Sequence, residues 1–127
     1  MKNNEFISVI IPLYNEEESI ETLYSELLSN LKGYEFEIIF INDGSFDNSS
    51  NIIKNIIKTG NIHLIELYKN YGKSAALSEG FKYCKGDYII TLDADLQDDP
   101  AEIPKLIQVL NTSDFDIISG WKKDRKD

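Results

Sequence analysis

Short apolar segments alternate with helical patterns along the chain, and this alternation constrains the fold more than any other feature. The segments are rich in isoleucine, valine and phenylalanine, a composition typical of strands that are buried on both faces of a sheet. We predict strands at residues 7–11, 36–41, 62–67, 88–92 and 116–119.

Between these segments, apolar residues recur with the spacing of amphipathic helices. The predicted apolar faces are Ile20, Leu23, Leu27, Leu28 and Leu31, then Ile52, Ile53, Ile56 and Ile57, then Ala76, Gly80 and Phe81, and finally Ile103, Leu106, Ile107 and Leu110. The resulting βαβαβαβαβ order predicts a three-layer α/β/α fold, a Rossmann-like open and mostly parallel sheet with helices on both faces. No linker or repeat divides the 127 residues, so we expect one domain or a piece of one.

Composition excludes several classes of protein. The net charge of −9 argues against nucleic acid as a partner, because phosphate backbones attract basic surfaces. Cys84 is the single cysteine, which rules out an internal disulfide. No apolar run approaches the ~20 residues of a membrane span, and the first residues lack a signal-peptide pattern. We therefore expect a cytoplasmic chain that does not span a membrane.

Several catalytic and nucleotide-binding motifs are absent from the sequence. Neither GxGxxG after the first strand nor GxxxxGK[ST] is present, so a dinucleotide site of that type or a P-loop is not supported. His63 is the only histidine and falls within a predicted strand, where we expect a packed or edge residue rather than a member of a catalytic triad. Trp121 either packs in the core, which we favour, or forms a platform against a ring.

Polar residues follow four of the predicted strands. Ligands of open α/β sheets bind beyond the carboxyl ends of the strands, where helix N-termini converge. The candidate segments are residues 12–16, 42–45, 68–73 and 93–97.

Asp93 and Asp95 are the strongest candidates for a metal site. On an extended backbone their Cα atoms lie roughly 6–7 Å apart on one side of the chain. A hard divalent ion, Mg²⁺ or Mn²⁺, would relieve the repulsion between the two carboxylates and leave positions open for a diphosphate. The spacing is also common in ordinary turns, so a structural role stays equally open on this pattern alone.

Other residues at the same edge have two interpretations each. Asp43 either accepts hydrogen bonds from a base or ribose, or forms a tight turn after which Ser45 or Asp47 caps a helix. Glu16 either lines the site or favours a helix N-terminus. Lys73 either attracts phosphate or is simply solvated.

The acidic residues after Asp95 are assigned mainly to structure. Asp99, Pro100 and Glu102 have the pattern of a helix start, with an N-cap, a proline at the first position and an acid at the third. Asp98 is a candidate outer-shell group of the ion.

Five motifs in register resemble one enzyme family. They are Ile10–Glu16 (IIPLYNE), Asn42–Ser45 (NDGS), Asn70–Lys73 (NYGK), Leu92–Asp98 (LDADLQD) and Gly120–Arg125 (GWKKDR). Their order and spacing resemble family 2 glycosyltransferases with a GT-A fold, and most closely the polyprenyl-phosphate branch that includes dolichyl-phosphate mannose synthases. One departure is Asn42, where many relatives carry a second aspartate.

The resemblance implies roles at the donor nucleotide. Pro12, Tyr14 and Glu16 would line it, and Asp43 would contact its base. The donor would be a nucleotide-diphosphate sugar, linked to UDP or GDP.

The resemblance also implies roles in the transfer reaction. Asp93 would approach the ribose or a metal-bound water, and Asp95 would bind Mg²⁺ or Mn²⁺. Gln97 would lie near the sugar or acceptor phosphate, and Arg125 would neutralise phosphate charge. The sugar would pass with inversion to an acceptor, a polyprenyl phosphate or a glycan.

The resemblance places the acceptor-binding part beyond Asp127. Residues 1–127 would form the nucleotide-sugar-binding N-terminal portion of a GT-A domain, and we expect the fragment to bind donor but transfer sugar poorly. The full-length protein would act at the cytoplasmic face of the membrane, and exposed core could drive homo-oligomerisation. The alternatives are a non-catalytic nucleotide-binding or scaffold module and, less favoured, a nucleotidyltransferase.

Overall fold

The computed structural model describes residues 5–58, 60–96, 98–111 and 117–119, and the side chains of residues 5–58, 60–96 and 98–109. The strands are β1 (Phe6–Leu13), β2 (Glu35–Asn42), β3 (Ile62–Glu66), β4 (Tyr88–Thr91) and β5 (Ile117–Ser119). The helices are α1 (Ile20–Asn30), α2 (Ser49–Ile56), α3 (Lys73–Tyr83), the 3₁₀ turn η1 (Pro100–Glu102) and α4 (Ile103–Asn111).

The strands form one parallel sheet in the order β3-β2-β1-β4-β5. The chain first moves outward from β1 through β2 to β3, and then returns to the other side of β1 to add β4 and β5. The order reverses between β1 and β4, which is where open α/β sheets bind their ligands. The predicted Rossmann-like parallel sheet is therefore confirmed.

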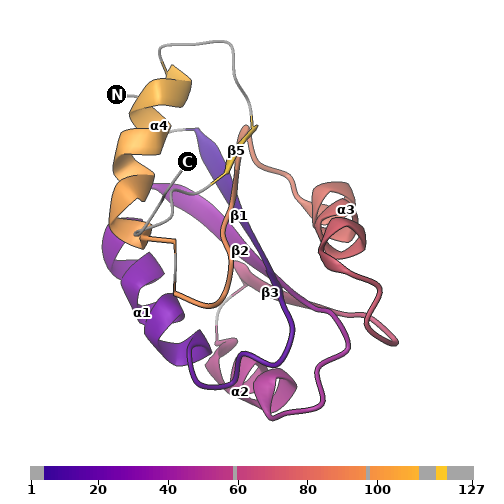
Figure 1. The fold of residues 1–127 in the computed structure, drawn as a ribbon. Coiled ribbons are helices and arrows are strands. Elements are labelled where there is room, and N and C mark those ends of the chain that lie inside the picture. Colours follow the sequence, from indigo (N-terminus) through magenta and orange to yellow (C-terminus); the bar gives the residue numbers. More distant parts are fainter. Residues whose placement is uncertain (1–4, 59, 97, 112–116, 120–127) are drawn as a thin grey trace, which may run out of the picture.

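Helices cover both faces of the sheet, as predicted (Figure 1). On one face, α1, α2 and α4 share the main apolar core with residues of β1, β2, β3 and β4. On the other face, α3 packs through Ala76 on Ile10, Ile39 and Ile41. The three-layer arrangement thus has a large core on one side of the sheet and a small one on the other.

The close approach of α3 to the sheet depends on Gly80. A Cβ atom at this position would lie 2.5 Å from Cγ2 of Ile10 and 3.0 Å from Cδ1 of Ile41. The small residues of α3 therefore let its axis come close to β1 and β2.

Two residues of the predicted helical faces were assigned wrongly. Leu28 of α1 and Phe81 of α3 are exposed, whereas their neighbours Leu27 and Gly80 are buried. Each lies one position along from a buried residue, about 100° around the helix, so it turns away from the sheet. Leu110 falls outside the described side chains.

Strand boundaries differ from the prediction mainly at the carboxyl ends. β1 continues to Leu13 and β2 to Asn42, so Pro12 lies within a strand rather than after it. The pairing of β1 with β4 ends at Ile10, and Pro12 pairs only with β2. Its missing N–H group therefore breaks no hydrogen bond to β4. Asp116, predicted to begin the fifth strand, lies outside the described residues.

A buried polar cluster lies at the amino end of the sheet. Glu37 of β2 is 3% exposed and accepts hydrogen bonds from the Ser8 hydroxyl at 2.6 Å and the Lys85 main-chain N–H at 2.8 Å. Its other oxygen lies 3.5 Å from Nε2 of His63, whose Nδ1 is 3.2 Å from the Tyr83 hydroxyl. His63 belongs to the outermost strand β3 and is partly buried, which confirms the expected edge position.

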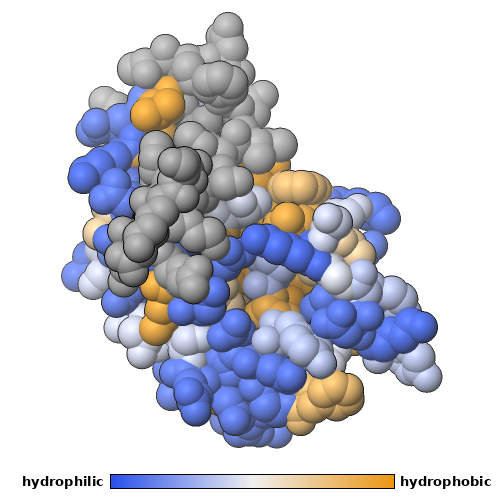
Figure 2. Space-filling model, in the orientation of Figure 1, coloured by the Kyte–Doolittle hydropathy of each residue, from blue (hydrophilic) through white to orange (hydrophobic). Residues whose placement is uncertain are grey.

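The face of the molecule seen in Figure 2 is largely hydrophilic where residues are described. Figure 2 shows hydrophilic residues over much of the visible face, with hydrophobic residues emerging in smaller patches. In the part of the chain that the structure describes, no helix combines the length and apolar character that crossing a membrane requires.

Candidate functional site

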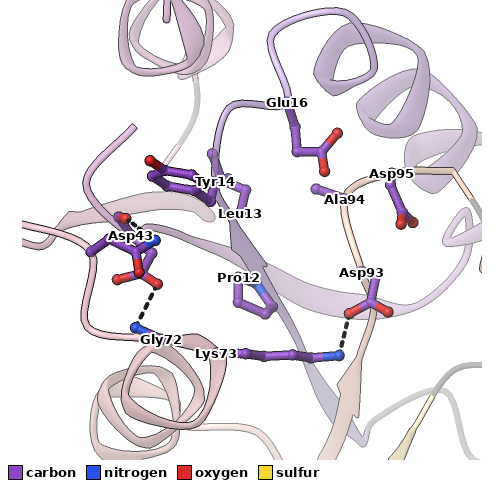
Figure 3. Close-up of a pocket in the computed structure, with 11 residues that line it drawn as sticks. Pro12, Leu13, Tyr14, Glu16, Asp43, Gly72, Lys73, Asp93, Ala94 and Asp95 are labelled. Atoms are coloured by element: carbon purple, nitrogen blue, oxygen red, sulfur yellow. Dashed lines mark hydrogen bonds and ion pairs between the residues drawn. The ribbon is translucent and has the colours of Figure 1, made fainter. Parts of the chain in front are cut away.

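A pocket of about 400 Å³ opens at the carboxyl edge of the sheet, where the strand order reverses. It is lined by Pro12, Leu13, Tyr14, Glu16, Asp43, Asn70, Gly72, Lys73, Asp93, Ala94 and Asp95. Tyr14 and Asp43 lie on one side of it, and Glu16, Asp93 and Asp95 on the other (Figure 3). The structure thus brings together seven of the predicted site residues from four separate segments.

Asp93 and Asp95 follow β4 and are held by their own loop. The buried Asp98 carboxylate accepts a hydrogen bond from the Asp93 N–H at 2.6 Å. Leu96 adopts a φ of 66°, a left-handed conformation that costs an ordinary residue roughly 1–2 kcal/mol. The sharp turn directly after Asp95 is therefore imposed by the surrounding structure, as strained positions at binding sites often are.

Lys73 reaches across the pocket to Asp93. Its ammonium lies 2.6 Å from Oδ1 of Asp93 (Figure 3), and the two side chains are 60% and 20% exposed. The lysine is the first residue of α3 and follows Gly72, which has a φ of 103°. The two interpretations of Lys73 from the sequence, a phosphate contact or a solvated side chain, did not include this ion pair.

Asp43 fixes the loop that leads into α3. Its two carboxylate oxygens accept hydrogen bonds from the N–H groups of Tyr71, at 2.8 Å, and Gly72, at 3.0 Å. The Asn70 side-chain amide donates to the Asp43 carbonyl at 3.2 Å. Asp43 is therefore a buried anchor of the β3–α3 loop as well as a pocket residue.

The chain bends at Gly44, which has a φ of 75°, where a tight turn was predicted, and the side-chain interactions that follow involve two loops. Asp47 accepts a hydrogen bond from the N–H of Ser49, the first residue of α2, at 2.9 Å. Ser45 instead accepts from the Asn15 N–H at 2.9 Å. The N-cap of α2 is Asn48, which makes no side-chain capping bond, so neither predicted residue takes that position. Asp47 bonds to the helix from one residue earlier, and Ser45 connects two loops.

Asn15 was missed by the sequence reasoning as a loop-fixing residue. It adopts a φ of 54°, and its side-chain oxygen accepts hydrogen bonds from the N–H groups of Phe46, at 2.8 Å, and Asp47, at 3.3 Å. The available signal was its type, because an asparagine in the loop after a strand tolerates left-handed backbone and bonds to nearby main chain.

The contacts of Asn42 favour an amide at a position where many members of the family that the motifs resemble carry aspartate. Its amide nitrogen donates to Oε1 of Glu66 at 2.9 Å, and its oxygen accepts from the Ser45 N–H at 3.2 Å. An aspartate in this conformation would place a second carboxylate against Glu66. The side chain is thus engaged in tying β2 to β3.

Glu16 carries a raised pKa. Burial is the largest cause, and the negative charge of Asp95 is the second; a hydrogen bond from Ser19 opposes them. Since α1 begins at Ile20, Glu16 lies in the preceding loop, and the acid of the first helical turn is Glu21. The site therefore concentrates negative charge on the side of Asp95.

Tyr14 presents an aromatic ring at the mouth of the pocket. Its ring meets that of Phe46 edge to face, with centroids 6.2 Å apart, and Phe46 is 87% exposed. The exposed ring of Tyr14 offers a stacking surface for a planar group.

Three predicted residues cannot be placed. Gln97, Arg125 and Trp121 lie outside the described residues. The predicted helix start next to the site is confirmed, because the Asp99 side chain accepts a hydrogen bond from the Ala101 N–H and Pro100 opens the 3₁₀ turn η1.

The donor set of the pocket fits a hard divalent cation that is shared with a ligand. Within the described part of the chain, no three His, Cys, Asp or Glu side chains are grouped as a closed metal site needs. Asp93 and Asp95 nevertheless line one pocket and offer carboxylate oxygens, the ligands that Mg²⁺ and Mn²⁺ prefer. Such an ion would complete its coordination with water and with the phosphates of a ligand.

Solved structures with a similar fold are glycosyltransferases. Glucosyl-3-phosphoglycerate synthase from Mycobacterium tuberculosis, in complex with Mn²⁺, UDP and glucosyl-3-phosphoglycerate, matches with a TM-score of 0.71 at 24% identity, over 87% of this chain and 41% of that one. A mannosyltransferase from Pyrobaculum calidifontis in complex with GDP-Man and Mn²⁺ matches with a TM-score of 0.64 at 23% identity, over 70% of this chain and 27% of that one. The chain has the GT-A fold of these enzymes.

Curated relatives share more sequence. An undecaprenyl-phosphate 4-deoxy-4-formamido-L-arabinose transferase from Pseudomonas fluorescens is 39% identical over 95% of this chain and 36% of its own length. A transferase of the same name from Shewanella sediminis is 40% identical over 99% of this chain and 39% of its own length. The chain thus spans less than half the length of these relatives.

The family model for glycosyl transferase family 2 matches residues 8–127, nearly the whole chain. With the parallel sheet and the carboxylate-lined pocket at its reversal point, this match shows that the chain belongs to glycosyl transferase family 2.

Proposed function

We propose that this chain forms the donor-binding part of a metal-dependent, inverting glycosyltransferase that moves a sugar from a nucleoside diphosphate to a polyprenyl phosphate. The observation that carries the proposal is the convergence of Asp93, Asp95, Tyr14 and Asp43 on one pocket at the reversal point of the sheet. The names of the curated relatives support the lipid-phosphate acceptor.

The proposed roles follow the position of each side chain. Tyr14 offers a ring for the base, beside Pro12, and Asp43 lies on the same side of the pocket (Figure 3). The two oxygens of Asp43 already accept main-chain N–H groups, so any contact with the base would use the remaining lone pairs. Base recognition therefore depends on Asp43 both directly and through the loop that it fixes.

Asp95 and Asp93 would hold Mg²⁺ or Mn²⁺ together with the donor diphosphate. The bound ion would supply positive charge to the departing nucleoside diphosphate. Lys73 adds a second positive group on the same side of the pocket as Asp93, and Asp98 fixes the Asp93 main chain. These residues bind and orient the leaving group, while Gln97 and Arg125 remain proposed neighbours of the sugar and phosphate.

The acceptor chemistry sets the demand for a base. A lipid phosphate is ionised at neutral pH and attacks the anomeric carbon without prior loss of a proton, whereas a hydroxyl acceptor needs a carboxylate base. With a lipid acceptor, the reaction would take place at the cytoplasmic face of a membrane.

Calorimetric titration with UDP and with GDP, each with and without Mn²⁺, tests the donor site. We expect one nucleotide to bind only with the metal, and Asp95→Ala to weaken binding at least tenfold, since a charged ligand contact contributes roughly 1.5–3 kcal/mol. Glu21→Ala, which removes an exposed carboxylate from α1, should bind like the wild type. Absence of binding in every combination, in a chain that is folded, would favour the scaffold alternative.

A further inference from the structure

The pocket carries an excess of negative charge. Among the described residues that line it, Glu16, Asp43, Asp93 and Asp95 are acidic, and Lys73 is the one cation. Carboxylates in one site repel each other, and the same field would repel an entering diphosphate. A positive group is therefore needed to balance the carboxylates both in the empty pocket and in the pocket with a diphosphate bound.

The ion pair of Lys73 with Asp93 provides that charge in a form that can be exchanged. Its Nζ–Oδ1 distance is 2.6 Å, but 60% of the lysine side chain and 20% of the aspartate side chain are exposed. An ion pair whose lysine side chain is largely exposed contributes little net stability, so a divalent cation can displace the ammonium from the carboxylate.

The main chain at Lys73 is held in place, whereas its side chain can rotate. Asp43 holds the N–H groups of Tyr71 and Gly72, directly before Lys73, and α3 begins at Lys73 itself. The four-carbon stem of a lysine has several rotatable bonds. The ammonium can therefore move from Asp93 to another anionic group in the pocket without movement of the main chain.

We propose that Lys73 is an internal counter-ion of the donor site. It neutralises Asp93 while the site is empty, competes with the divalent cation for that carboxylate, and turns to the donor diphosphate once the cation has bound. This inference rests on the proposed donor and metal site, and it assigns to Lys73 two opposite effects on two ligands.

The two effects have opposite signs in Lys73→Met. Removal of the competing ammonium should tighten binding of Mn²⁺ alone by about two- to fivefold, the range that an exposed ion pair allows. The same change should weaken binding of UDP or GDP at saturating Mn²⁺ by about tenfold or more, because a charge-assisted contact to phosphate is lost.

Titration of Mn²⁺ alone, followed by electron paramagnetic resonance, measures the first effect, and calorimetry with the nucleotide measures the second. Lys82→Met is the matched control. Lys82 lies on the same helix and pairs with Glu79 at a distance of 3.3 Å, and neither residue lines the pocket. Lys73→Arg keeps the charge and should bind Mn²⁺ like the wild type. Circular dichroism checks that each variant is folded, and Lys73→Gln serves as a second neutral variant.

The outcomes separate this inference from the proposed function. If the wild type binds Mn²⁺ and nucleotide but the neutral variants bind Mn²⁺ no more tightly, the counter-ion role is wrong and the donor site stands. If the wild type binds neither Mn²⁺ nor nucleotide, both proposals are overturned. Tighter metal binding with weaker nucleotide binding, absent from Lys82→Met, supports the inference.

Discussion

The two ends of strand β2 each place a buried carboxylate against a loop that flanks α3. At the carboxyl end, Asp43 accepts N–H groups from Tyr71 and Gly72, where the helix begins. At the amino end, Glu37 accepts the N–H of Lys85, just after the helix ends, and the hydroxyl of Ser8. One strand therefore holds both ends of one helix.

The two ends differ in what else lies nearby. The contacts described for Glu37 are made with Ser8, His63 and Lys85 of the chain itself, and its side chain is 4% exposed. Asp43 opens onto the pocket that also holds the Lys73–Asp93 ion pair. Each end thus has a buried carboxylate that accepts a main-chain N–H group. Asp43 shares its pocket with the predicted site residues, whereas Glu37 lines a separate pocket with His63 and Lys85.

The largest effect on stability is expected at the amino end. Glu37→Leu leaves the Ser8 hydroxyl and the Lys85 N–H without their acceptor, and each buried unsatisfied group costs roughly 1–3 kcal/mol. We expect a loss of about 3–5 kcal/mol in the free energy of unfolding, measured by urea denaturation. Glu35→Leu, at an exposed position of the same strand, is the control. Unchanged stability would mean that the cluster does not hold the end of α3.

A smaller loss of stability, combined with a loss of affinity, is expected at the carboxyl end. Asp43→Ala removes the acceptor of two N–H groups in a region that is partly open to water, and we expect a cost of about 2–3 kcal/mol. Nucleotide affinity should fall at least tenfold in the folded protein, because the start of α3 and Lys73 lose their anchor. Folded Glu37→Leu should retain the affinity of the wild type. Equal affinity losses in both variants would erase the distinction between the two ends.

The smallest effect is expected from Glu16, through pH. Burial and the charge of Asp95 raise its pKa above the ordinary value of 4.5, so ionisation is less favourable in the folded chain than in the unfolded one. The folded chain therefore loses stability as the pH rises through this raised pKa. Glu16→Gln should be more stable than the wild type at pH 7 by less than about 1 kcal/mol. The difference should vanish near pH 4 in the same urea series.

The sequence predicted the layers and the edge that carries the site, because both depend on the order of apolar and polar segments. Asp93, Asp95, Tyr14 and Glu16 follow buried strands, and parallel strands bring such residues to one edge. Local patterns also located the helix start at Asp99.

The partners of individual side chains could not be predicted. The pairs Asp43–Gly72, Asn42–Glu66 and Lys73–Asp93 join residues that are 20 or more positions apart, and their distances depend on the lengths of loops and the register of strands. The spacing of apolar residues in the sequence does not predict the three-dimensional course of the loops or the register of the strands. Leu28 and Phe81 were misplaced for a related reason, since an apolar residue beside a buried position is not itself buried.

The packing of Gly44 has a thermodynamic consequence for binding. A Cβ atom there would lie 2.5 Å from both the Asn70 nitrogen and the Lys69 carbonyl carbon, so the β2–α2 and β3–α3 loops touch through their main chains. Asn15 ties the β1–α1 loop to the same assembly. A ligand entering the pocket meets segments whose conformational entropy was lost during folding, and its association therefore involves little further ordering of these loops.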